Sequence, residues 1–389
     1  MGETRKFAFL VHPRDMADIK RPLPWTKNIP DHFINFISER LFGRMGFIHW
    51  SRFPVYDKVE GNIIFVSLTG KQMITLPRRY VQNRILDAVL FAQDKLKVDI
   101  VGLGAYTAPL TDAGEWLIKQ NVKVKITHGD SYSVAMAHEG VLISAKHAKL
   151  ELKNAKATVI GAYGLIGKPL CKLLAKECKA LILIGRNILK LKKLKEEIEG
   201  SNNNFLITIS TKLEDVSACD LIISSTSHPG ALLQDFHLKK RAVIYDIAQP
   251  INATPEVIAK RPDVTRIDGC FVNIPNIDLK IDMGPPKGTT FSCLGETILQ
   301  TLENDNSHHV GEIDLAHVET TREWGKKHKI QHADLTCFSQ PLKALNELIP
   351  AACGAGNLIS KSKGKMRNTK DSSRCNYSNC EGVWLIPAI

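Results

Sequence analysis

The fold is decided by residues 156–187, KATVIGAYGLIGKPLCKLLAKECKALILIGRN. An apolar run leads into a turn with glycines at positions 161, 164 and 167, a helix is expected over 166–178, and a second apolar run, ALILIG, follows. This order of strand, glycine turn, helix and strand is typical of a parallel β-α-β unit. We therefore predict an α/β protein built on a Rossmann-type, doubly wound parallel sheet.

The same alternation continues towards the C-terminus. A helix is expected over 188–199, and further strands are expected over 205–210, 220–226, 241–247 and 264–267. Strands that alternate with helices at this spacing specify one parallel sheet. We assign the dinucleotide-binding domain to residues 151–285.

A second α/β domain is expected over residues 1–150. Its predicted elements are a strand pair within 62–76 that turns at Thr69-Gly70, helices over 79–96 and 112–120, strands over 98–104 and 122–127, and a long helix from Ser131. Because this part has no glycine-rich phosphate-binding turn, we expect it to bind the substrate, including an acyl chain, rather than a cofactor.

The remaining sequence divides into two segments. Residues 286–342 carry Cys293 and two helices, over 293–302 and 312–327, which are expected to return the chain to the first domain. Residues 343–389 are polar and basic and lack periodicity, so we expect a disordered tail.

Composition narrows the class of protein. The 389 residues are 44% hydrophobic and 24% charged, as in soluble globular proteins, and the formal charge is +12. No apolar run is long enough for a transmembrane segment and the N-terminus does not resemble a signal peptide, so a cytoplasmic protein is expected. The positive charge favours an acidic partner such as a small carrier protein, although solvated lysines without a partner explain it equally well. No nucleic-acid-binding motif is present, so no nucleic acid partner is expected.

The nine cysteines are scattered, and none form the C-x-x-C pairs of zinc or redox sites. We expect reduced thiols and no metal site. Cys171, Cys178, Cys219 and Cys270 fall in or beside predicted core elements, which indicates packing roles.

The glycine turn is the predicted cofactor site. Glycines allow the backbone to approach a pyrophosphate, and the N-terminus of the following helix faces the phosphates. The spacing is G-x-x-G-x-x-G rather than G-x-G-x-x-G, so a tight turn without a ligand is the alternative. The residues of the turn expected to contact the cofactor are Gly161, Tyr163, Gly164, Leu165, Ile166 and Gly167.

The end of the second strand indicates which cofactor binds. An NAD site usually has Asp or Glu there for the ribose hydroxyls, whereas Arg186 and Asn187 offer donors to a 2′-phosphate. We therefore predict NADPH, the alternative being that Arg186 is simply solvated. Ser225 and Thr226, at the end of the strand over 220–226, complete the predicted site.

Cys293 is the candidate nucleophile. It lies in GTTFSCLGETILQ, after a Gly/Pro loop and at the start of an apolar helix. Amides at a helix N-terminus stabilise a thiolate, so we expect a lowered thiol pKa. When only its position is considered, the competing interpretation of Cys293 is a thiol that packs in the core.

Seven blocks of the sequence resemble, in order, the cyanobacterial long-chain fatty acyl-[acyl carrier protein] reductase family over roughly residues 7–335. The blocks are SLTGKQMITLPRRYV (67–81), DIVGLGAYT (99–107), THGDSYSVAMA (127–137), ATVIGAYGLIGKPLCKLL (157–174), LILIGRN (181–187), VIYDIAQP (243–250) and TFSCLGETIL (290–299). The N-terminal 60 residues match loosely, and the part after Leu342 has no counterpart.

The resemblance implies a reaction. In that family, the cysteine matched by Cys293 accepts the acyl chain, and the glycines matched by Gly161, Gly164 and Gly167 hold NADPH. An acyl carrier protein or coenzyme A thioester would then be the substrate and a fatty aldehyde the product. The oligomeric state stays open.

The turn over residues 127–131, THGDS, matches a family turn near the active site and could supply oxyanion donors. His128 is a candidate proton donor by type, with a structural histidine as the alternative. Asp130 and Ser131 are interpreted as helix caps.

Two other functions stay possible. A dehydrogenase of the shikimate type also combines a substrate domain with a Rossmann domain, but it would leave Cys293 without a role. A non-enzymatic NADPH-binding module with a basic tail for acidic partners is the other alternative.

Overall fold

The computed structural model describes residues 4–14, 16–21, 24–26, 28–42, 45–200, 206–228 and 230–342. The predicted tail over 343–389 lies outside the described residues. No helix of the described part is long and apolar enough to span a bilayer.

The first sheet has five strands in the order β2-β3-β1-β4-β5. Their bounds are β1 Arg5–Val11, β2 Phe47–Val55, β3 Val59–Val66, β4 Ile100–Leu103 and β5 Lys125–Thr127. Neighbouring strands run parallel except for β2, which is antiparallel to β3. The carboxyl ends of β1, β4 and β5 therefore lie along one edge, where functional residues gather in parallel sheets.

Helices cover both faces of this sheet. Phe7 and Phe9 of β1 pack with Ile298 of α11 (Ser292–Leu302), whereas Leu10 packs on the opposite face with Ile85 of α4 (Arg78–Phe91). Successive residues of a strand point to opposite faces, so a strand buried on both is apolar throughout. The other elements of this part are α1 Met16–Lys20, η1 Pro24–Thr26, α2 Asp31–Phe42, α3 Gly70–Thr75, the π-helical turn η2 Ala92–Leu96, α5 Thr107–Leu110 and α6 Glu115–Ile118.

The second sheet has six parallel strands in the order β11-β10-β9-β6-β7-β8. The bounds are β6 Lys156–Ile160, β7 Ala180–Ile184, β8 Leu206–Ser210, β9 Leu221–Ser224, β10 Val243–Asp246 and β11 Thr265–Asp268. Read from β8, this is the Rossmann strand order, and the order reverses between β6 and β9. The predicted Rossmann-type α/β fold is confirmed.

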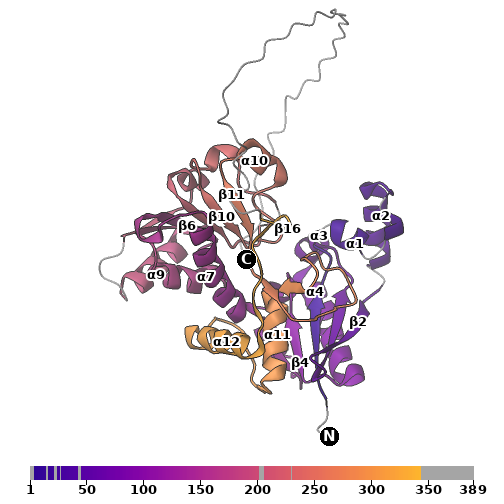
Figure 1. Ribbon diagram of the computed structural model, residues 1–389. Helices are drawn as coiled ribbons and strands as arrows, with labels where there is room; N and C mark the ends of the chain where they lie inside the picture. Colours follow the sequence, from indigo (N-terminus) through magenta and orange to yellow (C-terminus); the bar gives the residue numbers. More distant parts are fainter. Residues whose placement is uncertain are drawn as a thin grey trace, which may run out of the picture. The chain divides into compact units, whose positions relative to one another are not determined.

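Helices flank this sheet as well (Figure 1). Leu170 of α8 (Gly167–Leu174) and Leu191 of α9 (Ile188–Glu199) pack on one face with Val159 of β6, and Val257 of α10 (Pro255–Lys260) packs on the other with Ile244 of β10. The short 3-10 helices are η3 Leu152–Asn154, η4 Leu213–Ala218 and η5 Asp235–His237.

The two helices expected after residue 286 contact elements of the N-terminal part. Both α11 and α12 (Leu315–His328) pack against α7 (Asp130–His147), and α11 also contacts β1 and β4. A separate small sheet has its strands in the order β13 (Thr289–Phe291), β12 (Phe271–Asn273) and β14 (Gln331–His332). The described chain closes with the hairpin β15 (Thr336–Cys337) and β16 (Gln340–Pro341).

The strand pair predicted within 62–76 is wrong in its second half. β3 ends at Val66, and Thr69 caps helix α3 instead of forming a turn. The Thr69 hydroxyl accepts the Gln72 N–H (3.2 Å), and the Gln72 side chain accepts the Thr69 N–H (2.9 Å). This reciprocal capping box satisfies two backbone amides near the start of the helix. It therefore favours a helix here over the strand that the alternation of apolar and polar residues predicted.

Candidate active site

Two helix N-termini meet at Cys293. Cys293 is the second residue of α11, and Gly129, with a φ of +72°, is the N-cap of α7. A Cβ on Gly129 would lie 2.7 Å from the Cβ of Cys293 and 2.5 Å from its carbonyl oxygen, so only glycine fits there. The turn over residues 127–131 is therefore packed directly against the cysteine.

The protonation state predicted for Cys293 is wrong. Burial raises the pKa of the Cys293 thiol, and the neighbouring Asp130 carboxyl raises it further, while the Leu294 backbone N–H acts in the opposite direction. The resting side chain is therefore a thiol, and the helix N-terminus does not suffice to ionise it. Cys293 is partly exposed, whereas the four cysteines predicted to be packed are buried.

Glu296, one turn after Cys293, ties the two helices together. Its fully buried carboxylate accepts the Thr127 hydroxyl (3.0 Å) with Oε1 and the Tyr132 backbone N–H (2.7 Å) with Oε2. Tyr132 N–H belongs to the first turn of α7, where helices leave donors unpaired. Glu296 thus caps α7 from another helix, while the predicted cap residues Asp130 and Ser131 lie inside α7 after the N-cap Gly129.

Histidines line the far side of Glu296. His317 Nε2 lies 3.7 Å from Glu296 Oε1, and the His317 ring stacks on His309 with centroids 3.6 Å apart. His309 pairs in turn with Asp305 (2.6 Å). Burial alone would raise the pKa of Glu296, but His317, His128 and the Tyr132 N–H together lower it, so the carboxylate is ionised. Within the described ranges, no group of His, Cys, Asp and Glu is arranged to hold a metal ion.

His128 is buried beside this carboxylate. Its Nδ1 accepts the Asp130 backbone N–H (2.9 Å), which assigns the ring proton to Nε2. Burial lowers the pKa of His128 to about 4, although the negative charge of Glu296 acts to raise it. The ring is therefore neutral near pH 7.

The glycine turn has the geometry of a phosphate cradle. Gly161 has a φ of +86°, and a Cβ on Gly167 would lie 2.2 Å from the Gly161 carbonyl oxygen, so both positions require glycine. The N-terminus of α8 has no side-chain cap. Leu165 lines a pocket of about 250 Å³ between this turn and the segment before α12, whereas Ile166, the N-cap of α8, packs on the first sheet's core.

The end of β7 lies beside the glycine turn. A Cβ on Gly185 would lie 2.5 Å from the Tyr163 ring, and the Tyr163 hydroxyl accepts the Asn187 backbone N–H (3.2 Å). The Asn187 side chain caps α9, so it is engaged by the backbone amides of residues 189 and 190. The Arg186 side chain is exposed. Lys190 lies over the Tyr163 ring, with its Nζ 5.6 Å from the centroid.

Ser225 and Thr226, the last two residues of the predicted cofactor site, follow β9. The Ser225 carbonyl oxygen would lie 2.8 Å from a Cβ on Gly161, and the Cα of Thr226 would lie 3.2 Å from it. The structure therefore brings the ends of β6, β7 and β9 together as the parallel order requires. The segment after β4 of the first sheet also reaches this edge of the second sheet. There the Tyr106 hydroxyl donates a hydrogen bond to the Ser227 carbonyl oxygen (3.2 Å).

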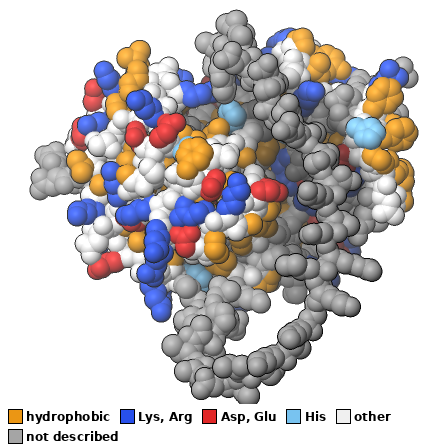
Figure 2. Space-filling view, turned by 90° about the horizontal axis from the view of Figure 1, so that it is seen from above, with side chains coloured by type: hydrophobic (Ala, Val, Ile, Leu, Met, Phe, Trp, Pro, Cys, Tyr) orange, Lys and Arg blue, Asp and Glu red, His pale blue; other side chains and the backbone are white. Residues whose placement is uncertain are grey.

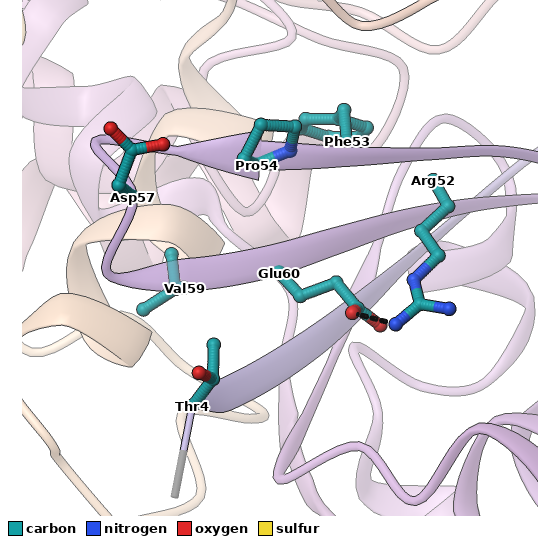
Figure 3. A pocket seen from close by; sticks show the side chains of 7 residues that line it. All are labelled: Thr4, Arg52, Phe53, Pro54, Asp57, Val59 and Glu60. Carbon is teal, nitrogen blue, oxygen red and sulfur yellow. Dashed lines mark hydrogen bonds and ion pairs between the residues drawn. The ribbon is translucent and has the colours of Figure 1, made fainter. Parts of the chain in front are cut away.

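Another pocket, of about 330 Å³, lies at the opposite edge of the first sheet. Figure 3 shows Arg52 and Glu60 paired there, across β2 and β3. It is lined by Thr4 at the amino end of β1 and by the β2–β3 hairpin, and its lining includes no cysteine or histidine. We therefore place the candidate site at Cys293.

Positive and negative side chains are mixed on the face that Figure 2 shows. Figure 2 shows Lys and Arg side chains interspersed with acidic ones on the left of that view, the side on which Figure 1 labels α9. On α9 the exposed lysines are residues 190, 192 and 193, as expected for its solvated face.

Three side chains of the site were missed by reasoning from the sequence: Glu296, His309 and His317. The only available signal was a carboxylate placed three residues after Cys293 in an apolar helix, where a charge must find buried partners. Those partners come from segments far along the chain, and no spacing rule reveals them.

The sequence is similar to a known family of dehydrogenases and to a known reductase. Residues 143–269 match the family described as shikimate / quinate 5-dehydrogenase. The long-chain acyl-[acyl-carrier-protein] reductase of Synechococcus elongatus is 23% identical over 326 residues, which cover 75% of this chain and 91% of the relative.

Solved structures give weaker likenesses. The nucleotide-binding domain of Thermoplasma volcanium glutamyl-tRNA reductase has a TM-score of 0.26 and 15% identity, covering 34% of this chain and 84% of that one. The iminosuccinate reductase of Paracoccus denitrificans, in complex with NAD+, has a TM-score of 0.25 and 19% identity, covering 32% and 39%. Likenesses this weak assign no ligand. The sequence relatives support an oxidoreductase with a nicotinamide cofactor.

Proposed function

We propose that this protein is an NADPH-dependent reductase that takes a long-chain acyl group from a thioester onto Cys293 and releases it as an aldehyde. The observation that carries the proposal is the position of Cys293, at the N-terminus of α11 and in contact with the N-cap of α7. Amides of a helix N-terminus stabilise negative charge on sulfur or on an acyl oxygen.

The chain's own residues fit the cofactor. Gly161 and Gly167 form a turn too tight for any Cβ, and it leads into the N-terminus of α8, which has no side-chain cap and would offer its amides to a pyrophosphate. Arg186, exposed at the end of β7, would bind the 2′-phosphate. When bound, NADPH supplies the hydride that reduces the acyl carbon.

The protein side of the reaction concerns sulfur and protons. The Cys293 sulfur attacks the thioester carbonyl, its S–H proton goes to the departing carrier sulfur, and an acyl-enzyme results. The Leu294 and Cys293 backbone N–H groups, which both act to lower the pKa of the Cys293 thiol, would stabilise negative charge that develops there. After reduction, the C–S bond breaks, and the aldehyde leaves as the sulfur regains a proton.

A carrier protein thioester is the preferred substrate. The relative from Synechococcus elongatus is named for that substrate, and the match covers 75% of this chain and 91% of the relative. The net charge of +12 favours an acidic carrier over a neutral one.

Aldehyde formation from a long-chain acyl thioester and NADPH tests the proposal. Cys293→Ser should abolish it, because a hydroxyl is a far weaker nucleophile than a thiol, and should leave NADPH binding unchanged. Cys219→Ser is the matched control, since Cys219 is buried beside η4 and should only affect stability. Near-normal activity of Cys293→Ser would overturn the proposal.

The match over residues 143–269 favours one second candidate, a dehydrogenase of the shikimate type that reduces a keto group without a covalent intermediate. That enzyme would need no thiol. Activity towards small keto acids that survives alkylation of Cys293 would support it.

A further inference from the structure

Asp130 carries a carboxyl group in an unusual setting. It is the first residue of α7, and its side chain is 17% exposed. His128 Nδ1 lies 3.9 Å from Asp130 Oδ2. That nitrogen already accepts the Asp130 backbone N–H, so it has no proton to offer the carboxyl. Among the described residues no lysine or arginine forms an ion pair with Asp130.

The groups that face Asp130 keep it protonated. Glu296 approaches from α11 as a buried anion, with His317 of α12 and His309 behind it, while His128, from the turn before α7, is neutral. The Cys270 thiol also interacts with Asp130, and it is neutral because burial raises its pKa. Burial, and then the charge of Glu296, raises the pKa of Asp130 to about 8. A carboxylic acid is thus favoured at neutral pH on the residue that follows Gly129, which touches Cys293, and this is the state a general acid requires.

Asp130 and Cys293 affect one another. A Cβ on Gly129, the residue before Asp130, would lie 2.7 Å from the Cα and Cβ of Cys293, and Asp130 raises the pKa of the Cys293 thiol when it is ionised. Burial makes a bare Cys293 thiolate costly. Expulsion of that sulfur from a reduced acyl group therefore needs a proton.

We propose that Asp130 donates the proton that the Cys293 sulfur takes up when the aldehyde is released, and that Glu296 is a positioning residue that keeps this proton on Asp130. The inference rests on the proposed function and deepens it. In the step, the C–S bond of the reduced adduct breaks, its O–H electrons form the aldehyde C=O, and that O–H proton passes to water. The sulfur takes the Asp130 proton, and solvent reprotonates the carboxylate.

The central variant is Asp130→Asn, which keeps the shape and removes the acid. Acyl-enzyme should still form on Cys293, but aldehyde release should fall about 100-fold. Asp112→Asn is the matched control, because Asp112 is an exposed partner of Arg78 outside the site. Near-normal release by Asp130→Asn would overturn the inference.

The pH dependence separates an acid from a structural role. Release by the unmodified protein should decline as pH rises through 8, because Asp130 then loses its proton, and the decline should be absent in Asp130→Asn. Glu296→Gln removes the neighbouring negative charge, so its decline should begin at lower pH, by about one unit. An unchanged profile in both variants would contradict the inference.

Alkylation of Cys293 by iodoacetamide gives a readout that needs no substrate. Asp130→Asn should lower the pH midpoint of alkylation, because a carboxylate no longer opposes the thiolate. An unmoved midpoint would overturn the coupling of Asp130 to Cys293, whether or not the protein reduces thioesters. Absence of an acyl adduct on unmodified Cys293, with a shifted midpoint, would instead refute the proposed function alone.

Discussion

Arg186 and Cys293 show how differently the fold treats its candidate functional residues. Cys293 is enclosed by α7, α11 and the turn between β5 and α7, so its chemistry depends on its neighbours. Arg186 is exposed at a strand end, and no acidic partner is found for it in the part of the chain that the structure describes. An unpaired guanidinium at that place is available for a phosphate.

We therefore predict that NADPH binds more tightly than NADH. Arg186→Asp should weaken NADPH binding about 100-fold, because a charged hydrogen bond is lost and a repulsive carboxylate is added. Lys192→Asp, with the same change of charge on the exposed face of α9, should have little effect. Fluorescence titration with both cofactors checks this, and equal affinity of the unmodified protein for the two would refute the role of Arg186.

At the scale of elements, the sequence predicts best where strands and helices alternate. The helix predicted over 188–199 is found as Ile188–Glu199, and the glycine turn lies between β6 and α8 as expected. β1 was not predicted, because it is buried on both faces and its apolar run has no alternation to read. The residues named from the sequence do gather at strand ends, but their protonation depends on tertiary partners such as Glu296.

The contact between α7 and α11 can be tested with one glycine. Gly129→Ala adds a Cβ that collides with Cys293, whereas Gly288→Ala meets nothing within 4 Å at a similar φ of +82°. Both should lose about 1 kcal/mol of unfolding free energy from the left-handed backbone. Only Gly129→Ala should also lower the rate of Cys293 alkylation and aldehyde formation, by about 100-fold, because the site shifts. Equal effects of the two variants would show that this contact does not matter.

At the scale of the whole molecule, the C-terminal hairpin covers a buried charge cluster. Arg266 pairs with Asp246 (3.2 Å) and with Asp268 inside the second sheet. Asp268 also accepts the Thr336 hydroxyl and the Ser339 backbone N–H, each at 2.7 Å. The Phe338 ring lies 4.4 Å from the Arg266 guanidinium carbon. The hairpin therefore belongs to the Rossmann half.

Two C-terminal deletions test which of the last residues the folded protein needs for stability. Deleting 343–389 should leave unfolding and NADPH binding unchanged, since contacts within the described residues already hold the hairpin on the second sheet. Deleting 336–389 should cost about 3 kcal/mol, because Asp268 loses two hydrogen bonds. Urea unfolding of both proteins checks this, and a large loss of stability in the shorter deletion would contradict the assignment.

The most direct test of the central claim is the mass of the intact protein after incubation with a long-chain acyl-carrier thioester in the absence of NADPH. We predict one added acyl group, mapped to Cys293 by peptide analysis, and its loss as aldehyde when NADPH is supplied. The adduct should be absent from Cys293→Ser and present in Cys219→Ser. No adduct, or an adduct on another cysteine, would contradict the account.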